Sequence, residues 1–332
     1  MKHRTGIAVL RSCARLILAL AAMAIVTQVR PSHAQAPDNV TLQLSWLAQG
    51  QASALFYGIQ QKCFSERNIN LTVQRGYGAL DTVGKIATGA AQFGQVDIGA
   101  VITSVSKNNA PIKAVMPLFS DSPLTIGILG GSPIKNLKDM EGRVLAAGPG
   151  EGGVLLLPAA MELEGGDASK IVRKSMEPAA LAGSLLQGQV DGIVTYTTTA
   201  AGINAVAAKA GKSVTSIDFG KALKIYGDVF ITSNDIAEKN SGLVDRFMEG
   251  VRCAYKGAYA NQEAAVKAMV TAAPEMDYGR ELMLAKLGWA LIFESASPAL
   301  QWDASRVARS LEVTSRAQNL TNASPATTFI RN

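Results

Sequence analysis

Strand-like and helix-like segments alternate along most of this chain, and that alternation constrains the fold more than any other feature. Val40 to Leu44 alternates apolar and polar residues, as a half-buried strand does, and apolar residues recur at helical spacing from Ala52 onward. Further strands are predicted over residues 70–74, 93–98, 112–119, 143–147, 170–176 and 190–196 and from Leu124, with helices over 81–88 and 179–187 and from Gly153. Strands that alternate with helices form parallel sheets, so the predicted fold class is α/β, with ligands bound at strand ends.

The last third of the chain is predicted to be mostly helical, over residues 243–260, 262–271, 279–293 and 305–318. An internal likeness links the two halves of the βα series. The helices that end near Thr88 and Gln187 are each followed by a glycine, Gly89 or Gly188, and then by a strand. This likeness indicates two similar lobes, and an apolar content of 48% is sufficient for two hydrophobic cores.

The first 34 residues have the composition of a secretory signal. Basic residues without acidic ones precede the apolar run Leu16–Val26, and the small residues Ser32 and Ala34 stand at −3 and −1 of the cleavage site that we expect near Ala34. The run is too short to be a stable membrane anchor. The sequence therefore predicts that residues 1–34 are a cleaved signal peptide and that the protein is exported to the periplasm.

Removing this segment changes both the charge and the histidine content. The formal charge falls from +6 to near +1, because residues 1–34 hold five basic side chains, and basicity then no longer indicates a nucleic-acid partner. His3 and His33 are the only histidines, and their loss excludes a Ser-His-Asp triad, a Cys-His pair and an HExxH zinc site. Carboxylate pairs and lysines remain for catalysis, but we predict a protein that is not an enzyme and that holds no metal or cofactor. Cys63 and Cys253 remain, and their spacing leaves open whether they pair.

The polar loop between the first strand and the first helix contains an indole and two carboxamides, Trp46, Gln49 and Gln51. Loops after strand ends bind ligands in open α/β sheets. A flat apolar ring beside side-chain amides suits a small molecule with a planar part and polar edges. The alternative is that Trp46 belongs to the core and the glutamines to the solvated surface.

Two further groups of candidates lie at helix starts. Gly78, Ala79 and Thr82 belong to a glycine loop that enters a helix, where N–H groups can hold an anion or a carbonyl oxygen. Asp97 and Thr103 stand where a strand leads into the next helix. Helix capping is the alternative interpretation for each of these two side chains.

The segment 148–153, Gly-Pro-Gly-Glu-Gly-Gly, satisfies the G-x-G-x-x-G pattern between a predicted strand and a predicted helix. Glu177 stands about where the ribose-binding acid of a dinucleotide site would be, so an exported NAD-type oxidoreductase is an alternative function. Three features oppose it: the unit lies mid-chain, Glu151 would face the pyrophosphate, and a periplasmic cofactor would need to be retained.

Several motifs occur in an order that is specific when they are taken together. They are Leu44-Ser45-Trp46 with Phe56-Tyr57-Gly58, then 68–71, 88–94, 134–143, 186–192 and 243–247. Over residues 40–270 the chain resembles the NMT1/THI5-like substrate-binding proteins of ABC importers. That group contains binders of nitrate, sulfonates, taurine, thiamine-precursor pyrimidines and riboflavin.

The resemblance implies a two-lobe, type II-like periplasmic binding protein in which each lobe is a mostly parallel sheet flanked by helices. We expect lobe 1 to comprise residues 38–119 and 226–332 and lobe 2 to comprise residues 120–225, with hinge crossings near 119–123 and 215–228. The implied function is capture of a small molecule by a monomer, for delivery to a membrane permease with a cytoplasmic ATPase. A ligand-sensing partner of a periplasmic receptor uses the same fold.

The resemblance also implies roles for particular residues. Gly150, Glu151 and Gly152 would form the cleft loop of lobe 2. In pyrimidine binders an aromatic residue at the position of Tyr196 covers the ligand, so Tyr196 and Trp46 would clamp a ring. The remaining candidates are Tyr57 from the first motif, Thr198 beside Tyr196, and Asp228 at the return crossing.

The chain departs from the pyrimidine binders at three positions of the first loop. Those proteins carry Asp, Asn and His where this chain has Ser45, Gln49 and Ala52. The departures put pyrimidine specificity in doubt and leave open which ligand binds.

Overall fold

The structure is a computed structural model that describes residues 36–295, 298–321, 325–326 and 330–331. The predicted signal peptide, residues 1–34, lies outside these residues. The fold below is that of the unit Pro37–Asn332. In the part of the chain that is described, no helix has both the length and the apolar composition needed to cross a membrane.

The first sheet has five strands in the order β2-β1-β3-β10-β4. They are β1 (Asp38–Leu44), β2 (Ile69–Gln74), β3 (Phe93–Asp97), β4 (Ile112–Pro117) and β10 (Asp228–Ser233). β1 pairs in parallel with β2 and β3, whereas β10 is antiparallel to both of its neighbours, β3 and β4. Four strands of this sheet are therefore parallel to one another, and β10 alone is reversed.

The second sheet repeats this arrangement in the order β7-β6-β8-β5-β9. Its strands are β5 (Leu124–Leu129), β6 (Val144–Ala147), β7 (Val172–Ser175), β8 (Gly192–Tyr196) and β9 (Val214–Asp218). Here β5 is the reversed strand. In each sheet the reversed strand is the one that the chain enters after leaving the other sheet. The predicted fold class, two mostly parallel sheets joined by crossing segments, is confirmed.

Helices cover both faces of the first sheet. One face packs on α2 (Ser53–Gln60), α10 (Ser241–Ala260), α11 (Gln262–Ala272) and α12 (Tyr278–Phe293), and the other on α3 (Ala79–Ala87) and α4 (Ile98–Asn108). Successive strand residues point to opposite faces. Phe93 and Phe230 accordingly join the α2 and α10 core, and Val96 and Val229 join the α3 and α4 core.

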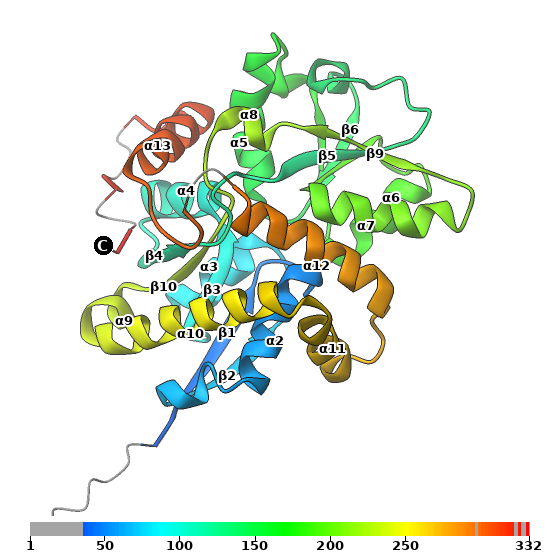
Figure 1. Cartoon of the computed structure of the whole chain (residues 1–332). Helices are drawn as coiled ribbons and strands as arrows, with labels where there is room; N and C mark the ends of the chain where they lie inside the picture. The colour runs from blue at the N-terminus through cyan, green and yellow to red at the C-terminus, as the bar shows by residue number, and fades with distance from the viewer. Residues whose placement is uncertain (1–35, 296–297, 322–324, 327–329, 332) are drawn as a thin grey trace, which may run out of the picture. The chain divides into compact units, whose positions relative to one another are not determined.

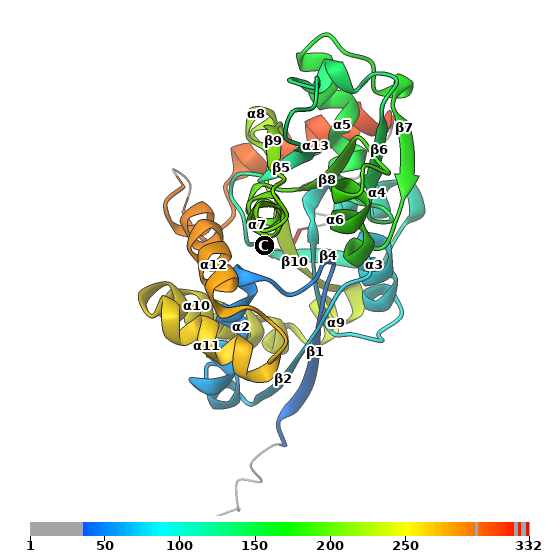
Figure 2. The same ribbon diagram turned by 90° about the vertical axis from the view of Figure 1, so that its right-hand side faces the viewer.

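The second sheet is covered in the same way. One face packs on α5 (Gly152–Leu163) and α8 (Gly220–Leu223), and the other on α6 (Pro178–Leu186) and α7 (Thr197–Ala208). Figures 1 and 2 show β5, β6 and β9 among these helices, and β1 and β2 beside α2, α10 and α11. The remaining short elements are η1 (Gly50–Ala52), η2 (Ser65–Arg67), η3 (Leu137–Met140), η4 (Ala168–Lys170) and α9 (Asn234–Lys239).

The predicted internal likeness has a structural counterpart. Gly89 follows the end of α3 with φ +78°, and Gly188 follows the end of α6 with φ +71°. Glycine adopts this left-handed conformation without the steric cost that a Cβ imposes, and it ends both helices. The strands that follow, β3 and β8, occupy the central position of their sheets. The two lobes are thus built from the same unit.

Cys63 and Cys253 form a disulfide with their Cα atoms 5.7 Å apart. The bond joins the turn after α2 to α10. Because the paired residues are 190 positions apart, the cross-link removes a large loop entropy from the unfolded chain, worth about 5 kcal/mol in the chain-entropy treatment. The structure thereby answers a question that the cysteine spacing left open.

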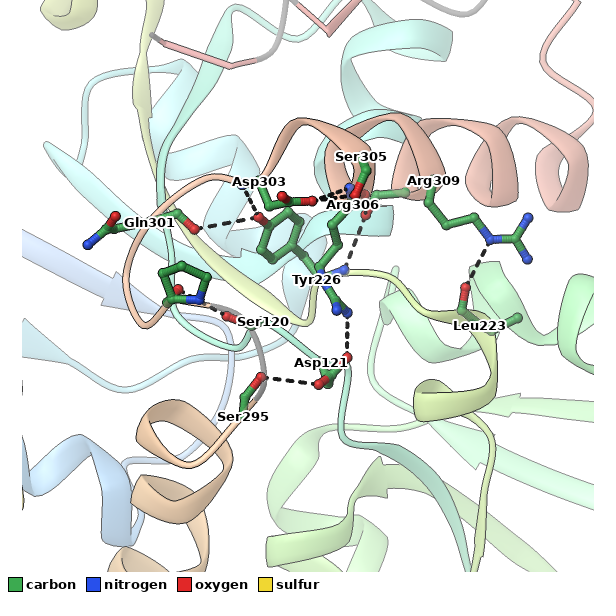
Figure 3. Close-up of polar contacts among 12 residues, drawn as sticks. Ser120, Asp121, Leu223, Tyr226, Ser295, Gln301, Asp303, Ser305, Arg306 and Arg309 are labelled. Carbon is green, nitrogen blue, oxygen red and sulfur yellow. Dashed lines mark hydrogen bonds and ion pairs between the residues drawn. The ribbon is translucent and has the colours of Figure 1, made fainter.

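The C-terminal helix α13 (Ala304–Gln318) packs on α4 from the first lobe and α5 from the second. Residues of this helix and of the preceding loop also bond to both crossing segments, which lie between β4 and β5 and between β9 and β10 (Figure 3). Arg306 pairs with Asp121 of the first crossing. The hydroxyl of Ser310 accepts from the N–H of Tyr226, in the second crossing, at 3.2 Å. We call this set of contacts the hinge clasp.

Candidate ligand-binding site

A cavity lies between the two sheets, where the carboxyl ends of β1, β3 and β8 meet the loop after β6. Its volume, counted as the space that the centre of a water molecule can occupy, is about 40 Å³. That is enough for a group of only a few heavy atoms. Its walls are formed by Leu44, Ser45, Trp46, Leu47, Gln49, Gln51, Ala52, Gln95, Glu151, Thr195, Tyr196, Thr199 and Asp228. Six of these were predicted as ligand-binding residues: Trp46, Gln49, Gln51, Glu151, Tyr196 and Asp228.

The first wall is the loop after β1, which is fixed by the neighbouring glycine loop. The N–H of Gly76 donates to the carbonyl of Trp46 at 2.7 Å, and that of Gly78 donates to the carbonyl of Ser45 at 3.0 Å. A Cβ at Gly76 would lie 2.1 Å from the carbonyl carbon of Ser45, so only glycine permits this approach. The Trp46 side chain packs against the core between the second sheet and α6 and α7, so it reaches across to the other lobe.

The two glutamines of this loop have different partners. Gln49 Oε1 accepts from the hydroxyl of Thr199, on α7, at 2.8 Å, which is a direct bond between the lobes. Gln51 Oε1 is buried without a hydrogen-bond partner among the described residues. Between them, the N–H of Gly50 donates to the fully buried carboxylate of Glu281 at 2.8 Å, which anchors the loop to α12.

The second wall comes from the pairing of β3 with β10. Asp97, the last residue of β3, lies directly opposite Asp228, the first residue of β10. Like charges placed opposite each other on antiparallel strands destabilise the pair. Gln95 lies diagonal to Asp228 and donates to it through Nε2 at 2.8 Å. Asp97 Oδ1 caps α4 by accepting from the N–H of Gly99 at 2.7 Å, so the predicted capping alternative is confirmed.

Tyr196 connects the second lobe to this acidic pair. It ends β8, and its hydroxyl donates to Asp228 Oδ1 at 2.5 Å. Its ring meets the edge of Phe119, in the first crossing, with the centroids 5.9 Å apart. Burial and the nearby carboxylates hold the pKa of the Tyr196 phenol well above its ordinary value. The phenol is therefore a hydrogen-bond donor at neutral pH.

The third wall is the loop 148–153, which follows β6 and opens α5, as the sequence predicted. A Cβ at Gly152 would lie 1.9 Å from Asp97 Oδ1, so the loop lies against the acidic pair. The loop also touches the glycine loop of the first lobe, because the N–H of Leu80 donates to the carbonyl of Pro149 at 3.3 Å. Gly150 adopts φ +68° beside Leu80.

The carboxyl groups of Glu151 and Asp228 border the cavity, that of Asp97 lies behind its wall, and each of the three has a raised pKa. Burial is the main cause, and it raises the pKa of Asp97 to about 8 with a further contribution from the charge of Asp228. Burial also raises the pKa of Glu151 to about 8, with Asp97 and Asp228 adding to it. Burial raises the pKa of Asp228, and the hydrogen bonds from Tyr196 and Gln95 lower it by a smaller amount. Repulsion between buried carboxylates favours the protonated forms.

The structure places the other predicted residues outside the walls of this cavity. They are Tyr57, Gly78, Ala79, Thr82, Asp97, Thr103, Gly150, Gly152 and Thr198. Asp97 and Gly152 lie directly behind the wall. Tyr57 instead packs against α10 near Gly257, and the Thr82 hydroxyl donates to the carbonyl of Leu44 at 2.8 Å. The start of α3 was predicted to hold an anion or a carbonyl oxygen, and one of its N–H groups, that of Leu80, donates to the carbonyl oxygen of Pro149 in the other lobe.

The wall residues that sequence analysis missed are Leu44, Ser45, Leu47, Ala52, Gln95, Thr195 and Thr199. Gln95 had a usable signal, because it lies two positions before Asp97 on the same strand and so shares its face. Thr199 had one as well, since it follows Tyr196 by three positions in a helical segment and so lies near it. The other residues could be identified only from the packing of the two lobes.

A second, larger groove adjoins the cavity and shares Trp46, Leu47, Gln49 and Thr199 with it. Its volume, counted in the same way, is about 630 Å³. Side chains of α6 and α7 and of the segment between α11 and α12 form most of its walls. The hydrogen bond between Gln49 and Thr199 therefore joins two residues that border both spaces.

Comparison with known proteins agrees with this architecture. The sequence model of the family described as NMT1/THI5 like matches residues 49–265. No curated protein sequence matches the chain.

Solved structures resemble this one at low sequence identity. The alkanesulfonate-binding protein SsuA from Xanthomonas axonopodis pv. citri, bound to MOPS, is 15% identical with a TM-score of 0.71, over 89% of this chain and 98% of that one. SsuA from Escherichia coli, an aliphatic sulphonate binding protein, is 15% identical with a TM-score of 0.67, over 89% and 92%. A Candida albicans gene product with the generic periplasmic binding protein fold is 13% identical with a TM-score of 0.67, over 89% and 96%.

Proposed function

Because the chain belongs to the NMT1/THI5-like family, we propose that it is the exported solute-binding component of an ABC importer. It captures a small organic molecule between two lobes in the periplasm and delivers it to a membrane permease with a cytoplasmic ATPase. The observation that carries the proposal is the cavity itself. Residues of both sheets form its walls, and side chains from the two sheets bond across it, as Tyr196 does to Asp228.

The proposed lobes are residues 38–119 with 226–332, and residues 120–225, joined by crossings near 119–123 and 215–228. The positions of the two sheets support this division. The helix α13 is best assigned to both lobes, since it packs on α4 and on α5. Opening and closing about the crossings would expose and enclose the cavity, as in other hinge-bending proteins.

Trp46 and Tyr196 are proposed to hold the solute from the two lobes, and the carboxamides and carboxyls around them to set its orientation. Both aromatic residues border the cavity, which supports this assignment. The sheet topology supports it as well, because open α/β sheets bind ligands beyond the carboxyl ends of their strands.

The dinucleotide-dependent oxidoreductase is disfavoured by electrostatics. In this structure the G-x-G-x-x-G loop lies against Asp97, and Glu151 and Asp228 border the same cavity. A pyrophosphate at this loop would face three carboxyl groups. A sensory role, in which the closed protein docks on a receptor, uses the same binding step and differs only in the partner.

The test is a screen of the purified chain for stabilisation by small solutes, NAD included, followed by small-angle scattering with each solute that binds. A solute present at 100 times its Kd should add about 2.7 kcal/mol to the free energy of unfolding. Binding with a smaller radius of gyration supports the proposal. Binding of NAD alone, abolished by Gly150→Val, would overturn it.

A further inference from the structure

The hydrogen-bonding atoms left unsatisfied around the cavity are acceptors or can act as acceptors. Gln51 Oε1, Gln95 Oε1 and Thr195 Oγ1 are buried without a partner among the described residues. The exposed fractions of Gln95 and Thr195 are only 7% and 4%. The orientation of the Gln95 amide is determined by its bond to Asp228, because the opposite orientation would set two oxygens against each other. Buried acceptors without donors are unfavourable, so N–H groups of a ligand would stabilise Gln51 Oε1 and Gln95 Oε1.

The ionisable side chains around the cavity are all acids. Glu151 and Asp228 border it, and Asp97 lies behind the wall with Oδ2 buried and without a partner among the described residues. None of the described wall residues is lysine, arginine or histidine. The groups that donate to Asp228, the Tyr196 phenol and the Gln95 amide, are uncharged and do not neutralise it. Buried charges require an opposite charge or many hydrogen bonds, and these carboxyls have neither in full.

The walls also contain two aromatic side chains, Trp46 and Tyr196. The face of an aromatic ring attracts a cation, most strongly where water is excluded. An anion would instead oppose the ionisation of the three carboxyl groups, and the Tyr196 phenol and the Gln95 amide, which could donate to it, already donate to Asp228.

We propose that the solute is an organic cation that places an ammonium or amidinium group in this cavity, where its N–H groups satisfy the acceptors of Gln51, Gln95, Glu151 and Asp228. This inference rests on the proposed function and deepens it. It separates this chain from the sulfonate-binding proteins that it resembles in fold.

The experiment compares three probes of similar shape, benzamidinium, benzamide and benzenesulfonate, by isothermal calorimetry on the purified chain. Acetamidinium is added as a smaller cation. Benzamidinium should bind at least about tenfold more tightly than neutral benzamide, the ratio expected for charge-assisted hydrogen bonds. Benzenesulfonate should not bind.

Two variants test which groups recognise the cation. Glu151→Gln and Asp228→Asn keep the shape of each side chain and remove its charge, and each should weaken benzamidinium binding about tenfold or more. The matched control is Glu312→Gln, a carboxylate on the outer surface of α13, which should bind benzamidinium as the unchanged protein does. Melting curves of the apoproteins show whether each variant is folded. An unchanged affinity in both cavity variants would overturn the proposal.

The other outcomes separate the two proposals. Tighter binding of benzenesulfonate than of benzamidinium, or binding of neither cation, overturns the cation assignment. Stabilisation by Mg²⁺ or Ca²⁺ alone that EDTA removes also overturns it, in favour of a metal. In each of these cases, closure with another solute in the scattering experiment still supports a solute-binding protein. If no solute in the screen binds or closes the protein, the proposed function fails as well.

Discussion

The two lobes meet at the hinge clasp and at the cavity, and the two regions are built in opposite ways. In the clasp, opposite charges pair, as Arg306 does with Asp121, and main-chain groups of the crossings have partners on the C-terminal segment. The side-chain hydroxyl of Tyr226 also accepts from the N–H of Asp303 at 2.6 Å (Figure 3). In the cavity, carboxyl groups face one another and buried acceptors lack donors.

This difference indicates that the contacts of the clasp persist without a ligand, whereas the polar groups of the cavity need one to be satisfied. Buried polar groups in proteins are almost always satisfied, and exceptions concentrate at functional sites. The clasp pairs its charges within the protein, so it can hold the crossings together through opening and closing. The cavity becomes complete only when a molecule supplies donors and positive charge. The predictions below test this contrast, in order of decreasing effect.

Gly152→Val should abolish tight ligand binding. The added side chain would begin 1.9 Å from Asp97 Oδ1 and would hold the lobes apart at the cavity. We expect the affinity for any solute that closes the protein to fall by about a hundredfold or more, or about 2.7 kcal/mol. Calorimetry measures the affinity, and scattering shows whether the protein still closes.

Gly242→Ala is the control, since Gly242 lies in α10 and a Cβ there would meet nothing within 4 Å. This control should bind as the unchanged protein does. Normal closure of Gly152→Val would contradict the close approach of the two lobes.

Arg306→Ala should destabilise the clasp by about 1–2 kcal/mol, because it removes a half-buried ion pair of Asp121 and leaves the Ser295 hydroxyl donating to that carboxylate. Urea unfolding measures the free-energy change. The matched control is Arg316→Ala on the same helix, whose partner Glu162 and own side chain are both largely exposed. Equal effects of the two substitutions would show that the clasp contributes no more than a surface ion pair.

The stability of the apoprotein should fall as the pH rises from about 5 to 8. Asp97 faces Asp228 on β10 and Glu151 at the start of α5, together with the N–H groups of Gly99 and Ala100, and Glu151 faces both aspartates. Their pKa values are raised to about 8, so the folded state keeps protons that the unfolded state has lost. That stabilisation is complete at low pH and is lost as the pH passes the folded pKa.

The expected loss is at least about 1 kcal/mol, the equivalent of a single pKa unit. Chemical unfolding at several pH values measures it. Glu151→Gln should flatten the profile, whereas Glu312→Gln should leave it unchanged. A stability that rises over this range would contradict the raised pKa values.

Tyr196→Phe should cost about 1 kcal/mol, because it removes the phenol that donates to the buried carboxyl of Asp228. Tyr259→Phe is the matched control, since its hydroxyl donates to Glu294 at an exposed position. That change should be close to neutral. If both substitutions are neutral in urea unfolding, the bond between Tyr196 and Asp228 does not stabilise the folded protein.

The sequence predicted most of the strands and helices because their periodicity is local. It did not predict β9 and β10. β10 lies between β3 and β4 with every residue buried, so it shows no apolar and polar alternation. β10 is antiparallel because the chain returns to the first sheet through the second crossing. The residues of the strand itself carry no signal for that direction.

The site was predicted in part for the same reason. Trp46 stands in the loop after β1, where open α/β sheets bind ligands, and Tyr196 was predicted from the family resemblance. The acidic character was not predicted, because Asp97 and Asp228 become neighbours only when β10 pairs with β3 in the observed register. The contact between Gly152 and Asp97 likewise depends on how the two lobes pack.

The most direct test of the central claim is the number of protons released when benzamidinium binds. Calorimetric titrations at about pH 7, in two buffers with different ionisation enthalpies, measure that number. Carboxyl groups with a pKa of about 8 are partly protonated at this pH, and a cation favours their ionised forms. The account predicts that binding releases protons and that Glu151→Gln reduces the release. Binding without proton release, or with proton uptake, would contradict it.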